Sequence, residues 1–250
     1  DLPQIHALSK KYGFRIIEDA AHSIGSTYDW NGTQISCGAC VHSDAAIFSF
    51  HPVKTITTGE GGAVLTNDNK LADRIRLMRS HGIERRGELL TKNDGPWYHE
   101  MTDISYNCRI TDFQCALGLS QLKKLEAFKV RRREIFDRYN DAFYKFDELK
   151  LPPDPKHSSI CYHLYTLRFN NGGEARYEIF QKLWKVKIYC QIHYIPVYWQ
   201  PYYHRKYGYQ TGKCPKAEEY YAHCLSLPLY PALTNDEVDY IIKSVVDCLQ

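Results

Sequence analysis

Several features that define other classes of protein are missing from this 250-residue sequence. No stretch approaches the roughly 18 consecutive apolar residues of a transmembrane helix, and no secretory signal peptide is recognisable, so we expect neither. The formal net charge is only +3. Such a small excess of positive charge gives no reason to expect a nucleic acid partner. Internal repeats and low-complexity segments are also missing.

The nine cysteines lack the even number and regular spacing of a disulfide framework. This pattern favours free thiols in a reducing compartment, so we expect a cytoplasmic protein. Cys37, Cys40 and His42 lie close together in the sequence. Three potential ligands are fewer than a structural zinc site needs, and no second Cys-x-x-C follows. We therefore expect no metal and interpret this stretch as a small loop insertion.

The composition is that of an ordinary globular protein, with 44% hydrophobic and 24% charged residues, and the chain is long enough for a sizeable core. Helical and strand patterns alternate along its first part, which predicts an α/β fold with a mixed or parallel sheet. Pro152 and Pro153 end a long predicted helix. We predict a large domain over 1–150, including this helix, and a smaller α+β domain over 151–250.

Individual elements follow from periodicity and from helix start and stop signals. The predicted helices span 3–12, 69–79, 111–146, 176–185, 216–225 and 234–249, and the predicted strands span 14–18, 45–48, 63–65, 163–169 and 188–194. Asn31-Gly32 predicts a hairpin turn within 26–35. Thr234 with Glu237 predicts a capping box at the start of the last helix.

The stretch around Lys54 carries the clearest sign of chemistry. It lies between the two predicted strands 45–48 and 63–65, after a serine and a proline turn and before three glycines. Partial burial there would disfavour the charged ammonium, and a neutral lysine amine can form a Schiff base with a carbonyl. The alternative is a surface lysine in a loop, where most lysines lie. The flanking residues favour the first interpretation.

Asp19 is the second candidate, because it directly follows the predicted strand 14–18. Open α/β sheets bind ligands beyond the carboxyl ends of their strands. An aldehyde cofactor attached to a lysine works as an electron sink only if its ring nitrogen stays protonated, and an aspartate beside that nitrogen keeps the proton there. An N-cap of a following helix explains Asp19 equally well.

Together these residues resemble a known family, the DegT/DnrJ/EryC1/StrS sugar aminotransferases. The resemblance extends from about residue 2 to the C-terminus. It rests on the runs Glu18-Asp19-Ala20-Ala21-His22, Phe48-Ser49-Phe50-His51-Pro52-Val53-Lys54, Gly59-Glu60-Gly61-Gly62-Ala63 and Asn107-Cys108-Arg109-Ile110, with Gln114 and Ala116-Leu117-Gly118 beyond. It implies a fold-type I enzyme that uses pyridoxal 5'-phosphate.

The resemblance also implies roles for individual residues. Lys54 would hold the cofactor and Asp19 its ring nitrogen, while His22 would lie near the phenolic oxygen and Ser49 on the phosphate. Asn107 would reach the phosphate of a neighbouring subunit, which implies a homodimer with shared active sites. Simpler alternatives are a helix-start histidine at position 22, a buried serine at position 49 and a helix N-cap at position 107.

The implied reaction moves an amino group from L-glutamate to C4 of a UDP-linked 4-keto-6-deoxy-N-acetyl sugar, as in pseudaminic acid-type nucleotide-sugar synthesis. Freed Lys54 would carry the proton between substrate and cofactor, with ping-pong kinetics. The stretch Gln191-Ile192-His193-Tyr194 would lie near the sugar nucleotide. The aromatic-rich run 194–203 fits the lining of such a pocket and the core of a small domain equally well.

The sequence opens at Asp1 directly in a helical pattern, whereas members of the family have a substantial segment before this point. We therefore expect a C-terminal fragment whose cofactor binding is weak on its own. This leaves two rival interpretations, a non-catalytic fragment that acts as an interaction module and another pyridoxal phosphate-dependent sugar-modifying enzyme of the same family. Known dehydratase relatives have histidine in place of the lysine, and Lys54 argues against that activity.

Overall fold

The structure is a computed structural model that describes residues 1–155 and 158–249. The chain forms two compact units, the first containing residues 1–126 and 157–160 and the second 127–156 and 161–250. The predicted domain boundary after residue 150 stays a prediction. No helix among the described residues is long and apolar enough to cross a membrane.

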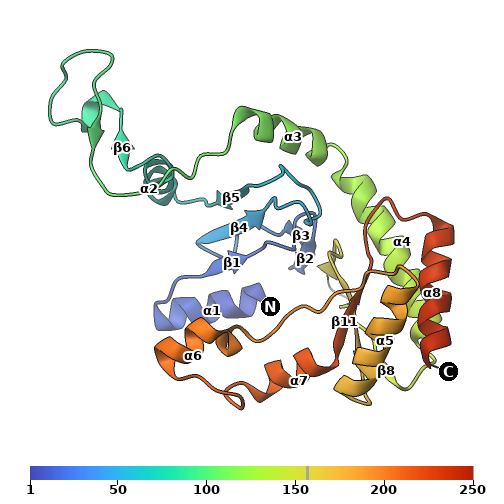
Figure 1. Cartoon of the computed structure of the whole chain (residues 1–250). Coiled ribbons are helices and arrows are strands. Elements are labelled where there is room, and N and C mark those ends of the chain that lie inside the picture. The colour runs from blue at the N-terminus through green and yellow to red at the C-terminus, as the bar shows by residue number, and fades with distance from the viewer. Residues whose placement is uncertain (156–157, 250) are drawn as a thin grey trace. The chain divides into compact units, whose positions relative to one another are not determined.

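The central sheet of the first unit has the strand order β1-β4-β5, with β1 at Ile17–Asp19, β4 at Ala45–Ser49 and β5 at Gly62–Leu65. Strand β1 pairs with β4 in parallel, and β4 pairs with β5 antiparallel. The predicted mixed sheet is therefore confirmed. Helix α1 (Leu2–Tyr12) lies beside this sheet (Figure 1), and Gly13 ends it in a left-handed conformation.

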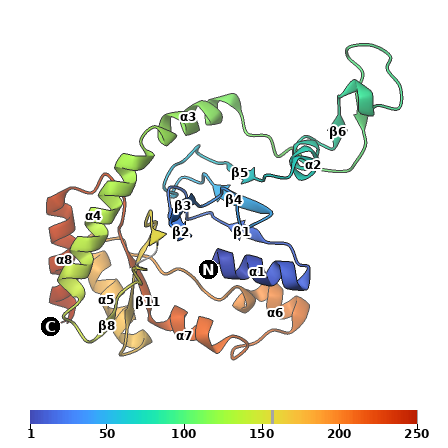
Figure 2. The ribbon, with the colours of Figure 1, turned by 180° about the vertical axis from the view of Figure 1, so that it is seen from behind.

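Other elements of the first unit surround this sheet. The predicted hairpin is confirmed as β2 (Thr27–Trp30) and β3 (Thr33–Ser36), and β2 also pairs with β9 (Ser158–Ser159). Helix α2 (Asn69–Arg79) is confirmed with Asp68 as its N-cap. Beyond its end, the hairpin of β6 (Ile83–Glu84) and β7 (Glu100–Met101) projects away from the β1-β4-β5 sheet (Figures 1 and 2). A short 3-10 helix, η1 (Gly87–Leu89), follows β6.

The predicted single helix over 111–146 is wrong. Two helices replace it, α3 (Asp112–Leu122) and α4 (Leu125–Phe143). The backbone N–H of Lys124 donates to the carbonyl of Gln121, only three residues back, which tightens the last turn of α3 and interrupts the regular ladder. The break lies close to the point where the chain passes from the first compact unit into the second.

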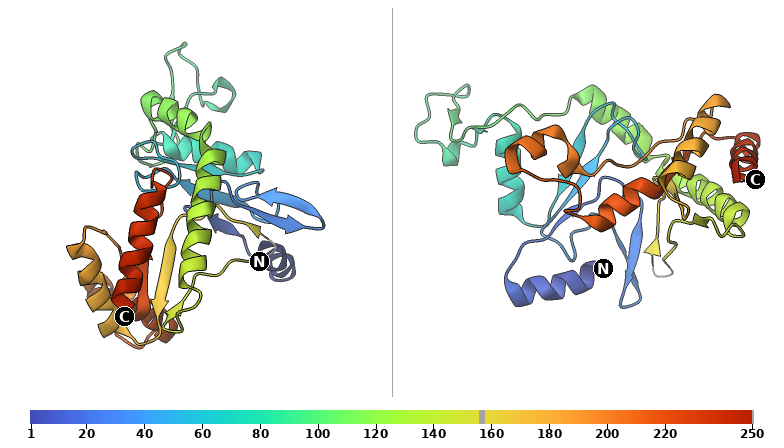
Figure 3. Two further views of the ribbon diagram at one scale, coloured as in Figure 1. Left: turned by 90° about the vertical axis from the view of Figure 1, so that its right-hand side faces the viewer. Right: turned by 60° about the horizontal axis from the view of Figure 1, so that its bottom comes forward.

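The second unit is built on a sheet of strand order β11-β10-β8, formed by β11 (Cys224–Leu227), β10 (Tyr165–Phe169) and β8 (Leu149–Lys150). Its buried core is rich in aromatic side chains, because Phe136, Tyr139 and Phe143 of α4 pack against Tyr165 of β10. Helices α5 (Gly173–Lys185) and α8 (Asn235–Leu249) pack against each other, and Figure 3 shows both from two further directions. The Thr234–Glu237 capping box before α8 is confirmed.

One other prediction for this unit is wrong, and one predicted helix ends earlier than expected. The predicted strand over 188–194 contains only an isolated bridge between Gln191 and Ser226, and a local bond from the Cys190 N–H to the Ile188 carbonyl turns the backbone. The predicted helix over 216–225 ends earlier, as α7 (Pro215–His223), because the buried run Cys224–Leu227 pairs with β10 instead. The aromatic-rich stretch forms η2 (Val197–Trp199) and α6 (Pro201–Tyr207).

Arg132 of α4 is a buried cation of the second unit, only 3% exposed. Its Nη1 donates hydrogen bonds to the carbonyls of Tyr162 (3.1 Å), His163 (3.2 Å) and Leu229 (2.8 Å). Burial lowers the pKa of its guanidinium. No carboxylate forms an ion pair with Arg132 in the described part of the chain. The arginine therefore satisfies three backbone carbonyls from two separate segments, 162–163 and 229.

Replacing this arginine tests how strongly it holds the unit together. We expect Arg132→Met to lower the free energy of unfolding by about 3 kcal/mol or more, because buried carbonyls lose a charged donor. Lys145→Met is the control, since Lys145 is exposed just beyond α4. The measurement is urea unfolding followed by circular dichroism. Equal stability of the two variants would show that the three carbonyls find other partners.

Candidate active site

The parallel pairing of β1 and β4 brings the first predicted site residues to one edge of the sheet. Asp19 pairs with Ile47 in register, and the Ala20 N–H donates to the Ile47 carbonyl at 3.0 Å. Ser49 follows Ile47 by two residues and therefore points to the same face of the sheet. Asp19 and Ser49 thus come together at the carboxyl ends of two parallel strands, where open α/β sheets bind ligands.

This face of the sheet is open and largely apolar among the described residues. Ile17 is 65% exposed, Ile47 42% and Val64 45%. Asp19 itself is exposed, and its Oδ1 accepts a hydrogen bond from the Ala21 N–H at 3.2 Å. This local bond orients the carboxylate. A turn follows Asp19 rather than a helix, so the N-cap interpretation of Asp19 is wrong.

Glu18 precedes Asp19 in sequence but points to the other face, because side chains alternate along a strand. Its carboxylate accepts a hydrogen bond from the Ser43 hydroxyl. The two neighbouring carboxylates therefore have different environments, one half-buried and bonded, the other exposed on the open face. His22 lies in the turn after Asp19 and is exposed, and no helix begins there.

Lys54 lies in the loop 50–61 between β4 and β5, where its side chain is half-buried. Its backbone N–H donates to the His51 carbonyl at 2.9 Å, which closes a turn. Thr55 and Ile56, the two residues after it, are 5% and 1% exposed. Lys54 is therefore held on a well-anchored loop, one residue before the chain enters the interior. Among the described residues, its amine forms no hydrogen bond or ion pair with another side chain.

Backbone bonds and close packing define this loop. The Phe50 N–H donates to the Gly61 carbonyl at 2.9 Å, and the Thr58 N–H donates to the Phe50 carbonyl at 3.0 Å. Gly61 has φ +154°, and a Cβ there would lie 2.4 Å from Thr58 Oγ1. A Cβ on Gly62 would lie 2.7 Å from the Phe48 carbonyl oxygen. Close packing therefore leaves no room for a side chain at Gly61, against Thr58, or at Gly62, against the Phe48 backbone.

Asn107 lies outside this loop, in the segment between β7 and α3. It forms an isolated bridge with Ser80, and its Oδ1 accepts a hydrogen bond from the Arg109 N–H at 3.2 Å. Thr111, in a capping box with Gln114, is the N-cap of α3. The interpretation of Asn107 as a helix N-cap is therefore wrong. Within the described residues, its amide nitrogen donates no hydrogen bond, and the side chain is exposed.

The predicted substrate stretch belongs to the second unit and lies against β11. Gln191 and Ser226 exchange two backbone hydrogen bonds, of 3.0 Å and 2.7 Å. The Nδ1 of His193 lies 2.8 Å from the Ser226 hydroxyl, and the peptide bond between His193 and Tyr194 is cis. Ile192 is half-buried, whereas Tyr194 is 66% exposed. The short segment 191–194 therefore presents polar and aromatic side chains that could contact a ligand.

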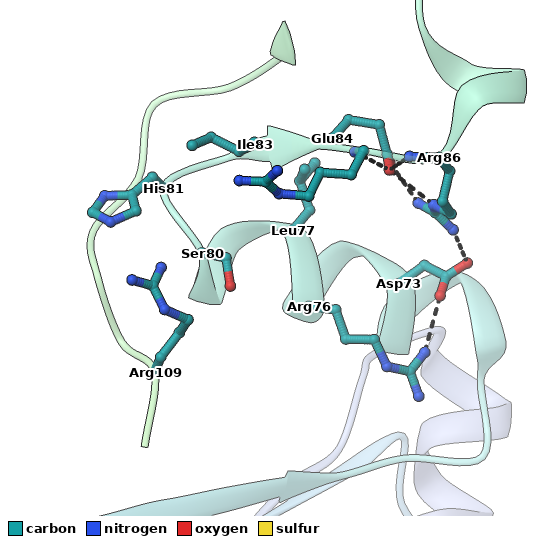
Figure 4. Close-up of a pocket in the computed structure, with 10 residues that line it drawn as sticks. Asp73, Arg76, Leu77, Ser80, His81, Ile83, Glu84, Arg86 and Arg109 are labelled. Carbon is teal, nitrogen blue, oxygen red and sulfur yellow. Dashed lines mark hydrogen bonds and ion pairs between the residues drawn. The ribbon is translucent and has the colours of Figure 1, made fainter. Parts of the chain in front are cut away.

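Among the described residues, two cavities of the first unit have linings that do not include Asp19, Ser49 or Lys54. The larger, of about 1360 Å³, lies between β4, β5, α2 and α3 and is mainly apolar. The smaller, of about 480 Å³, lies beside α2 and β6 and contains several arginines. The smaller cavity could not be predicted from the sequence, because only two of its arginines, 85 and 86, are adjacent and the fold brings them together with those at 76 and 109 (Figure 4).

Comparison with known proteins gives consistent matches along almost the whole chain. The model of the DegT/DnrJ/EryC1/StrS aminotransferase family matches residues 1–246. The UDP-4-amino-4,6-dideoxy-N-acetyl-beta-L-altrosamine transaminase of Campylobacter jejuni is 35% identical, and the match covers 100% of this chain and 62% of that protein.

Solved structures agree with this match. Helicobacter pylori PseC, an aminotransferase involved in the biosynthesis of pseudoaminic acid, is 31% identical with a TM-score of 0.86, covering 100% of this chain and 63% of that one. A second structure, the PLP form of a protein titled "Putative sugar aminotransferase Spr1654" from Streptococcus pneumoniae, is 29% identical with a TM-score of 0.82. This match covers 97% of this chain and 59% of that one. The chain therefore spans about three fifths of the length of these proteins.

The packing of Gly62 gives a test of the loop that carries Lys54. We expect Gly62→Ala to destabilise the protein by about 1–3 kcal/mol, because the new methyl group would overlap the Phe48 carbonyl. Gly87→Ala is the matched control, since a Cβ at Gly87 meets nothing within 4 Å. Thermal unfolding and hydrogen exchange of loop 50–61 measure the effect. A Gly62→Ala variant as stable as Gly87→Ala would contradict the close approach.

Proposed function

Because the chain belongs to the DegT/DnrJ/EryC1/StrS aminotransferase family, we propose that this protein is a pyridoxal 5'-phosphate-dependent aminotransferase with a nucleotide-sugar acceptor. The predicted fold-type I α/β class is confirmed by its structural neighbours. One structural observation, independent of the family match, supports the proposal. Asp19 and Ser49 share an open face at the carboxyl ends of β1 and β4, and the loop after β4 holds Lys54.

The side chains at this edge fit the chemical groups of the cofactor. The amine of Lys54 can bind its aldehyde, and the carboxylate of Asp19 can pair with its protonated ring nitrogen. The hydroxyl of Ser49 can bond to its phosphate. The apolar surface around Ile47 suits the face of an aromatic ring. We assign His22 to the phenolic oxygen, since a histidine can donate a hydrogen bond there.

When bound, the cofactor supplies an aldehyde and an electron-withdrawing ring for reactions at the carbon that bears the amino group. The Nζ of Lys54 would hold the aldehyde group, and as a free amine it would take up and return a proton at the reacting carbon of the amino donor. The Asp19 carboxylate would hold a proton on the ring nitrogen. The Ser49 hydroxyl would donate to a phosphate oxygen and fix the orientation of the group.

The proposed amino donor is L-glutamate, and the proposed acceptor is a UDP-linked 4-keto-6-deoxy-N-acetyl sugar that is aminated at C4. The name of the Campylobacter relative and the pathway of PseC support this acceptor, and thereby a role in pseudaminic acid-type synthesis. Gln191, Ile192, His193 and Tyr194 are assigned to the substrate. The nine free cysteines support a reducing compartment, the cytoplasm.

The two adjacent carboxylates of β1 provide the experiment that tests the proposal, carried out on the longest gene product that contains these residues. We expect Asp19→Asn to slow the reaction with glutamate by roughly a hundredfold or more, because the ring nitrogen loses its anionic partner. Glu18→Gln is the control, since Glu18 faces Ser43. Single-turnover absorbance changes measure both rates. Unchanged rates in Asp19→Asn, or equal losses in both variants, would reject the assignment.

Asn107 is the basis for a proposed homodimer with shared sites. Its exposed amide would donate to the phosphate bound by a neighbouring subunit, as the family resemblance implies. Such reciprocal sharing is expected of a two-fold dimer with a self-complementary interface.

Mixing two inactive variants tests this sharing. Lys54→Ala removes the amine, and Asn107→Asp places a negative charge against the phosphate. A mixed dimer then has one site with both lesions and one with neither, so we expect activity to return towards half of the wild-type value per mixed dimer. Asn93→Asp, in an exposed turn of the same region, is the control and should be active alone. If mixed dimers form but stay inactive, Asn107 acts in the site of its own subunit or in neither site of the dimer.

A further inference from the structure

The sheet of strand order β11-β10-β8 has one apolar and one polar face. Along β10, Tyr165, Leu167 and Phe169 are at most 2% exposed, whereas Thr166 and Arg168 between them are half-buried. Because side chains alternate along a strand, Thr166 and Arg168 lie on the face away from the aromatic core. We call the side of the sheet that carries these two residues the polar face. Half-buried polar groups on it need hydrogen-bond partners that the apolar core does not supply.

Ser226 brings a hydroxyl into an otherwise apolar strand. All four residues of β11 are buried, and Ser226, between Leu225 and Leu227, is 3% exposed. It pairs in register with Thr166, which places both side chains on the polar face, and their hydroxyl oxygens are 2.9 Å apart. A buried hydroxyl lowers stability unless it is hydrogen-bonded, so a serine suits this position better than an alanine only because its hydroxyl has partners.

His193 is the second of these partners. The segment that contains it runs beside β11, where Gln191 exchanges its two backbone bonds with Ser226, and Nδ1 of His193 lies 2.8 Å from the Ser226 hydroxyl oxygen. Cys224 lies two residues before Ser226 and on the same face, and its Sγ donates to the His193 carbonyl at 3.7 Å. Two residues of β11 therefore hold the backbone and the ring of His193. The side chains of Thr166, Ser226 and His193 form one hydrogen-bonded line.

The protons of this line can be placed by counting donors and acceptors. A hydroxyl donates one proton and can accept further bonds. When Thr166 donates to Ser226 and Ser226 donates to Nδ1 of His193, the proton of each hydroxyl has an acceptor. In a neutral imidazole the nitrogen that accepts carries no proton, so the ring proton then lies on Nε2. The line thus sets the tautomer of His193 as well as the orientation of its ring.

We propose that Ser226 and Thr166 are positioning residues, which hold the ring of His193 in one orientation with its proton on Nε2. Ser226 is buried and acts through His193 rather than on a ligand. The role of His193 towards a nucleotide-sugar acceptor rests on the proposed function. A keto oxygen only accepts hydrogen bonds, so the tautomer with a proton on Nε2 is the one that suits such an acceptor.

Nitrogen NMR of the longest gene product that contains these residues, made with isotope-labelled histidine, tests the tautomer without cofactor or substrate. The signals of His193 are those that disappear in His193→Gln. At about pH 8, where an ordinary histidine is neutral, we expect one tautomer with a bare Nδ1. Ser226→Ala should raise the fraction of the other tautomer at least about threefold, because Nδ1 loses its donor.

Position 166 offers a matched pair of variants. Thr166→Val removes the hydroxyl but keeps the shape, and we expect it to shift the tautomers in the same direction as Ser226→Ala. Thr166→Ser keeps the hydroxyl and should leave them unchanged. Ser244→Ala is the control, since it removes an exposed hydroxyl from α8 of the same unit. Circular dichroism confirms that each variant is folded.

Kinetics test the consequence for the proposed reaction. We expect Ser226→Ala to raise the KM for the nucleotide-sugar acceptor about tenfold, and to change the rate of the half-reaction with glutamate less than about twofold. The reason is that a displaced ring weakens contacts to the acceptor alone. Equal losses in both half-reactions would mean that Ser226 has only a structural role.

Three NMR results would overturn the proposal. A proton on Nδ1 in the wild type would reverse the direction of the line. Tautomer fractions that stay at the wild-type value in both Ser226→Ala and Thr166→Val would show that the hydroxyls do not set them. Equal effects of Thr166→Ser and Thr166→Val would assign the effect to packing. Because NMR requires no activity, these results leave the aminotransferase proposal intact, and loss of that proposal leaves the positioning of His193 intact.

Discussion

The parallel pairing of β1 with β4 is the interaction on which the candidate active site depends. It pairs Asp19 with Ile47, and Ser49, two residues after Ile47, lies on the same face of the sheet. A shift of one residue in this register would turn Asp19 away from that face and present Glu18 in its place, because side chains alternate along a strand. The bond from Ser43 to Glu18 and the buried Ala46 and Phe48 on the opposite side favour the observed register.

The loop after β4 places the lysine by a different means, through turns and close backbone contacts. Small residues fill the space where β4, β5 and the loop converge, and Gln114 of α3 donates to the Glu60 carbonyl at 2.9 Å. A Cβ at Gly118 of α3 would lie 2.9 Å from Thr58, so the helix also needs a small residue there. The glycines at 61–62 and Thr58 are thus small because the surrounding atoms pack closely, in addition to any role in binding.

Much of this site could be predicted from the sequence because its determinants are local. The apolar runs before Asp19 and Ser49 indicate strands, and Asn31-Gly32 specifies a hairpin without further context. Other features depend on contacts between distant segments. Whether Asn107 or Thr111 caps α3 is decided by the capping box with Gln114 and by the bridge from Asn107 to Ser80. The strand at 224–227 becomes recognisable only through its pairing with β10, since its buried residues also fit a helix.

The proposed activity requires Lys54 to carry the cofactor at the edge formed by β1 and β4. Borohydride reduction of the longest gene product in the presence of pyridoxal 5'-phosphate, followed by mass spectrometry of its peptides, tests this requirement. We expect one reduced cofactor per chain, attached to Lys54, and loss of the visible absorbance band on reduction. A cofactor found on other lysines, or none on Lys54 in an active protein, would contradict it.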